Sequence, residues 1–149
     1  MKGKVVVDTI FILPFFGVDV EGVDSEEVVR LKNKGFKLLY PKLLLVELIA
    51  KISKEAHRKG LKELPEAAKE ALESLMAETD VELVDPKPEH LIEAAKLRLL
   101  GHRDFFDNIL YATAYIEKAL LLTADKDLTS FIKEKGLKKD IIIIQSELV

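Results

Sequence analysis

Cysteine is absent from the 149 residues. This absence excludes disulfides, thiolate metal sites and a cysteine nucleophile, and it suits a reducing, cytoplasmic compartment. Long apolar runs are absent too, because charged residues or proline interrupt each run before the roughly 18–20 residues that a membrane span needs. We therefore expect a cytoplasmic protein with no membrane segment.

A surplus of positive charge is also missing. The net charge is -3 and the pI about 5.7, which argues against a protein that coats nucleic acid by bulk electrostatics and leaves room only for a local basic patch. The glycine-rich and nucleophile motifs G-x-G-x-x-G, G-K-[ST] and G-x-S-x-G do not occur. Dinucleotide-binding, P-loop and serine-hydrolase functions therefore have no support.

The alternation of short apolar runs with longer helical patterns indicates repeated strand–helix units and a parallel sheet. With 48% hydrophobic residues, the chain has enough apolar side chains for one core, so we predict a single domain over residues 1–149. The predicted fold class is α/β, with three α/β/α layers around a five-stranded parallel, Rossmann-like sheet. The predicted strands are 4–8, 36–40, 81–84, 119–123 and 141–144.

Helices are predicted between these strands from capping residues, prolines and glycines at their ends. The first covers 9–16, and the second begins at Asp24 or Ser25 and ends at the Asn-Lys-Gly turn. The others are a helix over 41–58 with Pro41 in its first turn, one beginning at 65, and helices over 89–100, 105–118 and 128–135.

Four acidic residues lie inside or at the end of strongly apolar segments: Asp8, Glu47, Asp107 and Asp125. A carboxylate in such a segment is costly unless a cation or a hydrogen-bond network stabilises it. Ligands of open parallel sheets bind beyond the carboxyl ends of the strands, where the strand order reverses. If the first and fourth strands are neighbours there, Asp8 and Asp125 face each other, and the helices bring Asp107 and Glu47 to the same place.

Carboxylates about 4 Å apart repel by about 4 kcal/mol at an effective dielectric of 20. They remain together only with a cation or a shared proton. Because cysteine is absent and no histidine pair has metal-ligand spacing, the candidate ligands are all oxygen atoms, which selects Mg2+ or Mn2+ over Zn2+. Such cations commonly serve phosphoryl chemistry.

The segments VVVDTIFIL, LLLVELIAK, DNILYATA and LLLTADKDL together resemble the PIN domain family, and their spacing is similar to that of single-domain toxin ribonucleases of the VapC type. The resemblance implies a divalent-metal endoribonuclease that forms a homodimer and is paired with an antitoxin protein, which would insert an arginine among the carboxylates. By position it implies that Asp8, Glu47, Asp107 and Asp125 are the catalytic residues and metal ligands. Supporting roles are implied for Thr9, Thr123 and Asp127.

Each of these residues also has a purely structural explanation. Asp8 could cap the first helix, and Glu47 could pair with Lys51. Asp104 fits the N-cap of the helix over 105–118, so we take Asp107 as the ligand and Asp104 as a cap or a supporting residue. Asp127 could cap the last helix.

A basic stripe follows Glu47 at intervals of four, three and four residues, so these side chains share one helical face. It consists of Lys51, Lys54 and Arg58. It could guide RNA phosphates to the acids, although an ordinary solvated face is the simpler explanation. Arg103 is a further candidate for RNA contact. The three histidines are predicted to lie on the surface.

Two other functions remain as alternatives to a metal-dependent ribonuclease. The first is a catalytically silent PIN-like module that binds RNA or protein. The second is a receiver-type phosphoacceptor domain, but that fold needs an acidic pair after strand one and a lysine after strand five, which this sequence lacks. The regions 24–34 and 41–58 carry more apolar residues than one side of a sheet hides, which favours a homodimer.

Overall fold

Five short parallel strands form the centre of the computed structural model, which describes residues 3–143. Their order is β3-β2-β1-β4-β5, so the chain first builds outward on one side of β1 and then crosses to the other side. Four strands have three to five residues and the fifth has two. Their bounds are β1 Lys4–Val7, β2 Lys37–Pro41, β3 Glu82–Val84, β4 Leu120–Leu122 and β5 Ile142–Ile143.

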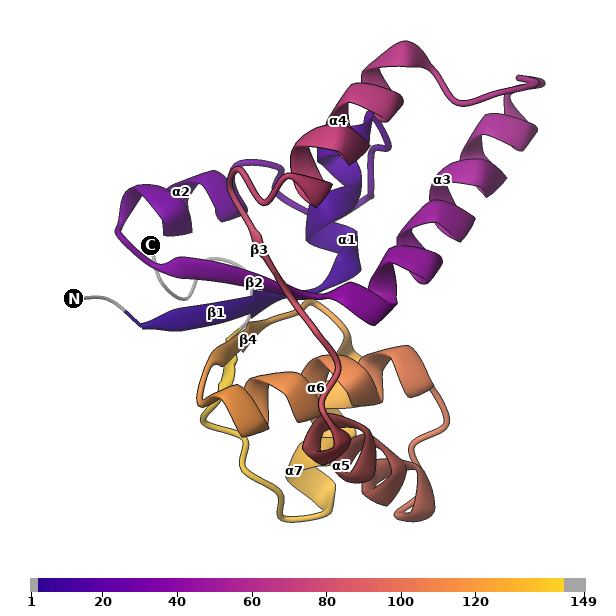
Figure 1. Ribbon diagram of the computed structural model, residues 1–149. Coiled ribbons are helices and arrows are strands. Elements are labelled where there is room, and N and C mark those ends of the chain that lie inside the picture. The colour runs from indigo at the N-terminus through magenta and orange to yellow at the C-terminus, as the bar shows by residue number, and fades with distance from the viewer. Residues whose placement is uncertain (1–2, 144–149) are drawn as a thin grey trace.

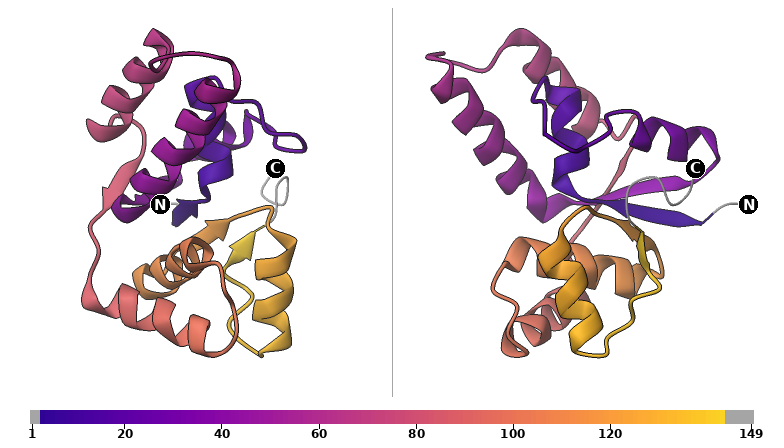
Figure 2. Two further views of the ribbon diagram at one scale, coloured as in Figure 1. Left: turned by 90° about the vertical axis from the view of Figure 1, so that its right-hand side faces the viewer. Right: turned by 180° about the vertical axis from the view of Figure 1, so that it is seen from behind.

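Helices cover both sides of this sheet, which gives three layers (Figure 1). The views from the side and from behind show the same two helical layers (Figure 2). One layer contains α1 Thr9–Ile12, the 3-10 helix η1 Leu13–Phe16, α2 Glu27–Asn33, the 3-10 helix η2 Lys42–Leu44, α3 Leu45–Arg58 and α4 Glu66–Met76. The other contains α5 Pro88–Leu99, α6 Phe105–Glu117 and α7 Lys126–Glu134. The predicted α/β fold with a parallel sheet is therefore confirmed.

The central strand β1 shows why the sheet needs helices on both faces. Val5, Val6 and Val7 are consecutive and all fully buried, whereas a strand with one wet face would alternate buried and exposed residues. The β-branched run is suited to such a two-sided strand. Because β1 pairs with β2 on one edge and β4 on the other, the strand order reverses at β1, and the predicted proximity of the first and fourth strands is confirmed.

Pro41 and the start of the last helix were assigned wrongly. Pro41 is the last residue of β2 instead of the first turn of a helix, and the 3-10 turn η2 separates it from α3. The predicted helix over 9–16 has the expected bounds but consists of α1 followed by the 3-10 helix η1, which Gly17 ends at a φ of 82°. The last helix begins at Lys126, two residues earlier than predicted. The predicted fifth strand reaches Ile144, which lies outside the described residues.

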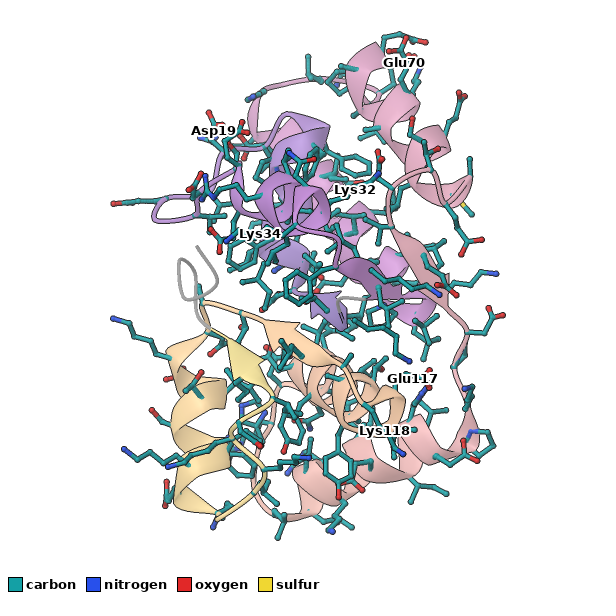
Figure 3. The ribbon with its side chains drawn as sticks, turned by 90° about the vertical axis from the view of Figure 1, so that its left-hand side faces the viewer. Asp19, Lys32, Lys34, Glu70, Glu117 and Lys118 are labelled. Atoms are coloured by element: carbon teal, nitrogen blue, oxygen red, sulfur yellow. The ribbon has the colours of Figure 1, made fainter. Side chains whose placement is uncertain are left out.

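The prediction that all histidines lie on the surface is also wrong. His90 is buried in the first turn of α5, where its Nδ1 accepts a hydrogen bond from the Lys87 backbone N–H. Its Nε2 lies 2.8 Å from Glu117 near the end of α6 (Figure 3). Lys87 also contacts Glu117, at 3.1 Å. These polar contacts fasten the start of α5 to the end of α6, which sequence periodicity does not reveal.

None of the helices within residues 3–143 combines the length and apolar character that crossing a bilayer requires.

Candidate functional site

Asp8 directly follows β1, and its side chain serves two neighbours. One carboxylate oxygen accepts a hydrogen bond from the Ile10 N–H at 3.4 Å, which makes Asp8 the N-cap of α1. The other accepts a bond from the Thr123 hydroxyl at 2.8 Å. The carboxyl group is 6% exposed. The capping role considered from the sequence is thus present. Asp8 also binds a buried threonine that follows β4, however, so capping α1 does not account for all of its contacts.

Thr123 connects the ends of β1 and β4. It is fully buried, and while its hydroxyl donates to Asp8, the same oxygen accepts the N–H of Asp125 at 3.0 Å. One side chain therefore fixes the two acids that follow neighbouring strands.

Asp125 is the N-cap of α7. Its carboxylate accepts the N–H of Leu128 at 3.0 Å. The prediction that Asp127 caps this helix is therefore wrong, because Asp127 lies in the first turn and is exposed. The capping residue and the predicted ligand are the same aspartate, since the helix begins earlier than its apolar pattern indicates.

Asp107 lies in the first turn of α6 and is 8% exposed. Asp104 caps this helix by accepting the N–H groups of Phe106 and Asp107 at 3.1 and 3.2 Å, so the predicted cap is confirmed. Burial raises the pKa of Asp107, and the neighbouring Asp125 carboxyl and the charges of Asp125, Asp104 and Asp8 raise it further, to about 9. Asp107 is therefore protonated at neutral pH in the metal-free protein.

The proton of Asp107 is shared with Asp125. Burial alone would raise the pKa of Asp125, but the hydrogen bonds from Asp107 and from the N–H groups of Leu128 and Asp127 outweigh burial, and its pKa is lowered. The two carboxyl groups thus form a pair in which one holds a proton and the other is ionised.

Glu47 lies in the first turn of α3, which begins after η2. Its side chain is 12% exposed, and the ammonium group of Lys51 is 3.9 Å away. The alternative partner considered from the sequence is therefore present, at the long end of an ion pair. Glu47 also acts on Asp8: burial chiefly raises the pKa of Asp8 to about 6, bonds from Thr123 and Ile10 oppose this, and the Glu47 charge adds to the rise.

Thr9 does not bond to an acid in the described structure. Its hydroxyl is fully buried and lies 2.7 Å from the hydroxyl of Tyr40, which in turn donates to the Leu44 carbonyl at 3.0 Å. Sequence reasoning missed Tyr40, because a tyrosine inside an apolar strand looks like ordinary core.

His102 and Asn108 form a second buried pair that sequence reasoning missed. His102 Nδ1 lies 2.8 Å from Asn108 Oδ1, and Asn108 Nδ2 donates to the His102 carbonyl at 3.0 Å. The ring of Phe131 packs on His102 with centroids 4.9 Å apart. These contacts tie the loop before α6 to α7. An asparagine in the apolar segment DNILYATA was the available signal.

The basic candidates are all exposed, as a phosphate-binding surface requires. Lys51 contacts Glu47, and Arg58 pairs with Glu55 through Nε at 3.1 Å. Arg103 lies directly before the cap of α6. Lys51 and Lys54 are thus exposed on α3, the helix that carries Glu47, and Arg103 lies just before α6, the helix that carries Asp107.

A hollow of about 510 Å³ lies elsewhere, between η1, α2 and α4. Its lining is mostly apolar, with the ion pair of Lys32 and Asp80 at one side. Figure 3 shows Lys32 beside α4. None of the four acids lines this hollow, so it is separate from the candidate site.

The sequence model of the PIN domain matches residues 5–133. The chain belongs to the PIN domain family. A similar solved structure is a chain of VapBC2 from Rickettsia felis, in a crystal structure described as bound to a DNA fragment from their promoter. It is 15% identical, with a TM-score of 0.61 over 95% of this chain and 98% of that chain.

PAE2754 from Pyrobaculum aerophilum is likewise similar, at 18% identity and a TM-score of 0.61, over 97% of this chain and 85% of that chain. At these identities the likeness concerns the fold. The comparison with curated proteins gave no match. The family predicted from the four acidic segments is thus confirmed, and PIN membership removes the receiver-type alternative.

PIN domains generally use divalent metal ions, so the four acids must be tested against that requirement. The donors are carboxylate oxygens, which hard divalent cations prefer. Burial chiefly raises the pKa values of Asp8 and Asp107, and neighbouring acidic groups raise them further. Within residues 3–143, however, no three histidine or acidic side chains are arranged to hold a cation together. The donor chemistry therefore fits a divalent cation, although the described side chains are not arranged around a common point.

The raised pKa of Asp8 predicts how pH changes the stability of the metal-free PIN domain. The folded protein binds this proton with a pKa of about 6, against the ordinary 3.8. This contribution to stability is complete below pH 3.8 and is lost as pH rises through 6. Lowering the pH from 8 to 5 in EDTA should therefore raise the unfolding free energy of the wild type by about 1–2 kcal/mol more than that of Asp8→Asn, which has no proton to bind at this position.

Urea unfolding at the two pH values measures this difference, and at pH 8 Asp8→Asn should be no less stable than the wild type. Asp85→Asn is the control, because Asp85 also directly follows a strand but is 79% exposed and pairs with Lys42. If the unfolding free energy of Asp8→Asn rises between pH 8 and pH 5 by as much as that of the wild type, the pKa of Asp8 is not raised in the folded protein, and the prediction is wrong.

Proposed function

We propose that this PIN domain is an endoribonuclease that depends on Mg2+ or Mn2+. The observation that carries the proposal is the gathering of acidic residues at the point where the strand order reverses. Asp8 and Asp125 follow the adjacent strands β1 and β4, and Asp107 shares a proton with Asp125. A fold gains nothing from burying like charges together, whereas PIN domains are typically nucleases.

In this proposal Asp8, Glu47, Asp107 and Asp125 are the catalytic residues and hold the metal. The bound cation would polarise the scissile phosphate and lower the pKa of a water molecule. Thr123 fixes Asp8 through its hydroxyl and Asp125 through its backbone N–H. Asp107 must release the proton that it shares with Asp125 when a cation binds, so binding is favoured as pH rises.

The basic side chains would hold the RNA backbone beside these acids. Lys51 and Lys54 on α3 and Arg103 before α6 are exposed, and Arg58 would have to exchange Glu55 for a phosphate. Asp104 and Asp127 would act on the site through their charges and Thr9 through Tyr40. The cytoplasm, where RNA substrates are made and used, is the expected location.

The proposal predicts that the purified protein cleaves single-stranded RNA in Mg2+ or Mn2+ and that EDTA stops the reaction. Asp8→Asn removes a ligand charge with little change of shape, so we expect cleavage to fall by at least about 100-fold. Cleavage is measured on labelled RNA by gel electrophoresis, with Asp85→Asn as the matched control at wild-type rate.

Equal cleavage in EDTA would contradict the metal mechanism. If RNA binds in Mn2+ without being cut, the observation supports the alternative of a catalytically silent PIN-like binding module.

We also propose a homodimer, and exposed apolar side chains support it. Val46 in α3 is 70% exposed, and Leu43 and Leu91 line one shallow hollow between η2 and α5. Ile92 on α5 is 68% exposed. Large apolar side chains exposed to this extent favour covering by another protein surface, and a two-fold pair would bury the same side chains on both copies. The region around α2 contributes less than the sequence suggested, with Val29 only 37% exposed.

Light scattering should therefore give about twice the 16.8 kDa chain mass. Placing a charge in this patch with Val46→Glu should give monomers, because two buried unpaired carboxylates would face each other across the interface. Lys54→Glu, an exposed change on the same helix, is the control. A wild-type mass of 16.8 kDa at micromolar concentration would refute the dimer.

An antitoxin protein is the proposed partner. The VapBC2 structure supports this, and the acids provide a chemical basis: an arginine inserted among the carboxylates would form charge-assisted hydrogen bonds and exclude the metal.

Mn2+ should then weaken the binding of such a partner, identified as the product of an adjacent small gene. The competition is measured by titrating the partner at several Mn2+ concentrations. An Asp8→Asn, Asp125→Asn double mutant that binds the partner as tightly as the wild type would contradict the inserted arginine, while the ribonuclease assignment would stand.

A further inference from the structure

Tyr40 joins two segments that carry proposed ligands. It lies in β2 one residue before Pro41 and is fully buried. Its hydroxyl accepts a hydrogen bond from Thr9, the residue after Asp8, at 2.7 Å, and donates to the carbonyl of Leu44 at 3.0 Å. Both hydrogen-bonding directions of the phenol are used inside the protein.

The bond to Leu44 lies at a bend of the chain. β2 ends at Pro41, η2 covers the next three residues, and Leu44 is the residue that precedes α3. Glu47 follows in the first turn of α3. Because a helix is rigid over a single turn, the position of the Leu44 carbonyl sets where the side chain of Glu47 begins.

The electrostatics of Tyr40 agree with this location. Burial is the main cause of its raised pKa, the bond from Thr9 opposes it, and the charges of Glu47 and Asp8 add to the rise. The phenol therefore keeps its proton and remains a donor to Leu44 over the whole range in which the protein would act. Glu47 and Asp8 are close enough to Tyr40 to influence it although neither forms a hydrogen bond with it.

We propose that Tyr40 is a positioning residue, which fixes the start of α3 and thereby keeps Glu47 on the side of the sheet where Asp8 lies, so that both could ligate one divalent cation. The inference rests on the proposed metal-dependent function and adds a residue to it. Tyr40 itself does not touch the cation or the RNA; it acts through the Leu44 carbonyl and the start of α3. Removing the Tyr40 hydroxyl should therefore weaken metal binding more than removing a buried hydroxyl elsewhere in the core does.

Tyr111→Phe is a matched control for Tyr40→Phe. Tyr111 is also a buried tyrosine whose hydroxyl donates to a backbone carbonyl, that of Lys138 at 2.8 Å. The charges that act on it come from Tyr115, Glu93 and Asp140, none of which belongs to the proposed site. Tyr40→Phe removes two hydrogen bonds and Tyr111→Phe removes one, so both should lower the melting temperature, but only Tyr40→Phe should alter metal binding.

The test is calorimetric titration of each metal-free protein with Mn2+ alone. We expect Tyr40→Phe to weaken Mn2+ binding by about 10-fold, the lower end of the effect of losing a group that orients a ligand, and Tyr111→Phe to leave it unchanged. Thr9→Val keeps the bond between Tyr40 and Leu44 and should have a smaller effect than Tyr40→Phe. If Tyr40→Phe does not fold, Thr9→Val is the weaker form of the same test, because it removes the bond that orients the Tyr40 hydroxyl toward Leu44; Mn2+ affinity equal to that of Tyr111→Phe would then overturn the inference.

A double-mutant cycle asks whether Tyr40 acts through Glu47. Glu47→Gln should weaken Mn2+ binding, and adding Tyr40→Phe should then cause no further loss, because the side chain that Tyr40 positions no longer contributes its charge. Equal Mn2+ affinities of Tyr40→Phe and Tyr111→Phe, or independent losses in the cycle, would overturn the inference while wild-type metal binding and RNA cleavage remained intact. A wild-type protein that binds no Mn2+ would instead contradict the proposed function, and the role of Tyr40 with it.

Discussion

The hydrogen bond from Thr123 to Asp8 is the interaction on which the arrangement of the acids depends. It joins the ends of the two neighbouring strands β1 and β4, where the strand order reverses. The same hydroxyl accepts a hydrogen bond from the backbone N–H of Asp125, the N-cap of α7. Asp8 is therefore held by its own helix and by the neighbouring strand. Asp107 then approaches Asp125 from α6, so the buried negative charge is concentrated around one threonine.

The metal-free protein tolerates this concentration by protonation and by capping. Asp107 and Asp125 share a proton, and Asp8 and Asp125 use backbone N–H groups at helix starts to offset part of the cost of their burial. Capping and metal binding are thus not exclusive explanations of an aspartate after a strand. Here the cap stabilises the carboxylate in the metal-free state, at the position where a cation would later compete for it.

The parts of the fold with a regular pattern could be predicted from the sequence. The valines of β1 and the leucines of β4 have only one reasonable interpretation, and the acids at their ends pointed to a candidate site because a carboxylate after a buried strand needs a partner. Pro41 was assigned to the wrong element because proline suits both a first helical turn and the end of a strand, and only the pairing of β2 with β3 decides between them. His102, Asn108 and Tyr40 were missed because their roles depend on partners that lie elsewhere in the fold, such as Phe131, Thr9 and Leu44.

The pairing of β1 with β4 also determines when the site can form during synthesis. Thr123 lies 115 residues after Asp8, so a ribosome must have released this whole intervening segment before the two side chains can meet. Contacts between such distant segments form slowly, because a long loop must close before any interaction repays its entropy. A growing chain therefore carries Asp8 without its partners until the segment that contains Thr123 has left the ribosome, and the group of acids is assembled only after that point.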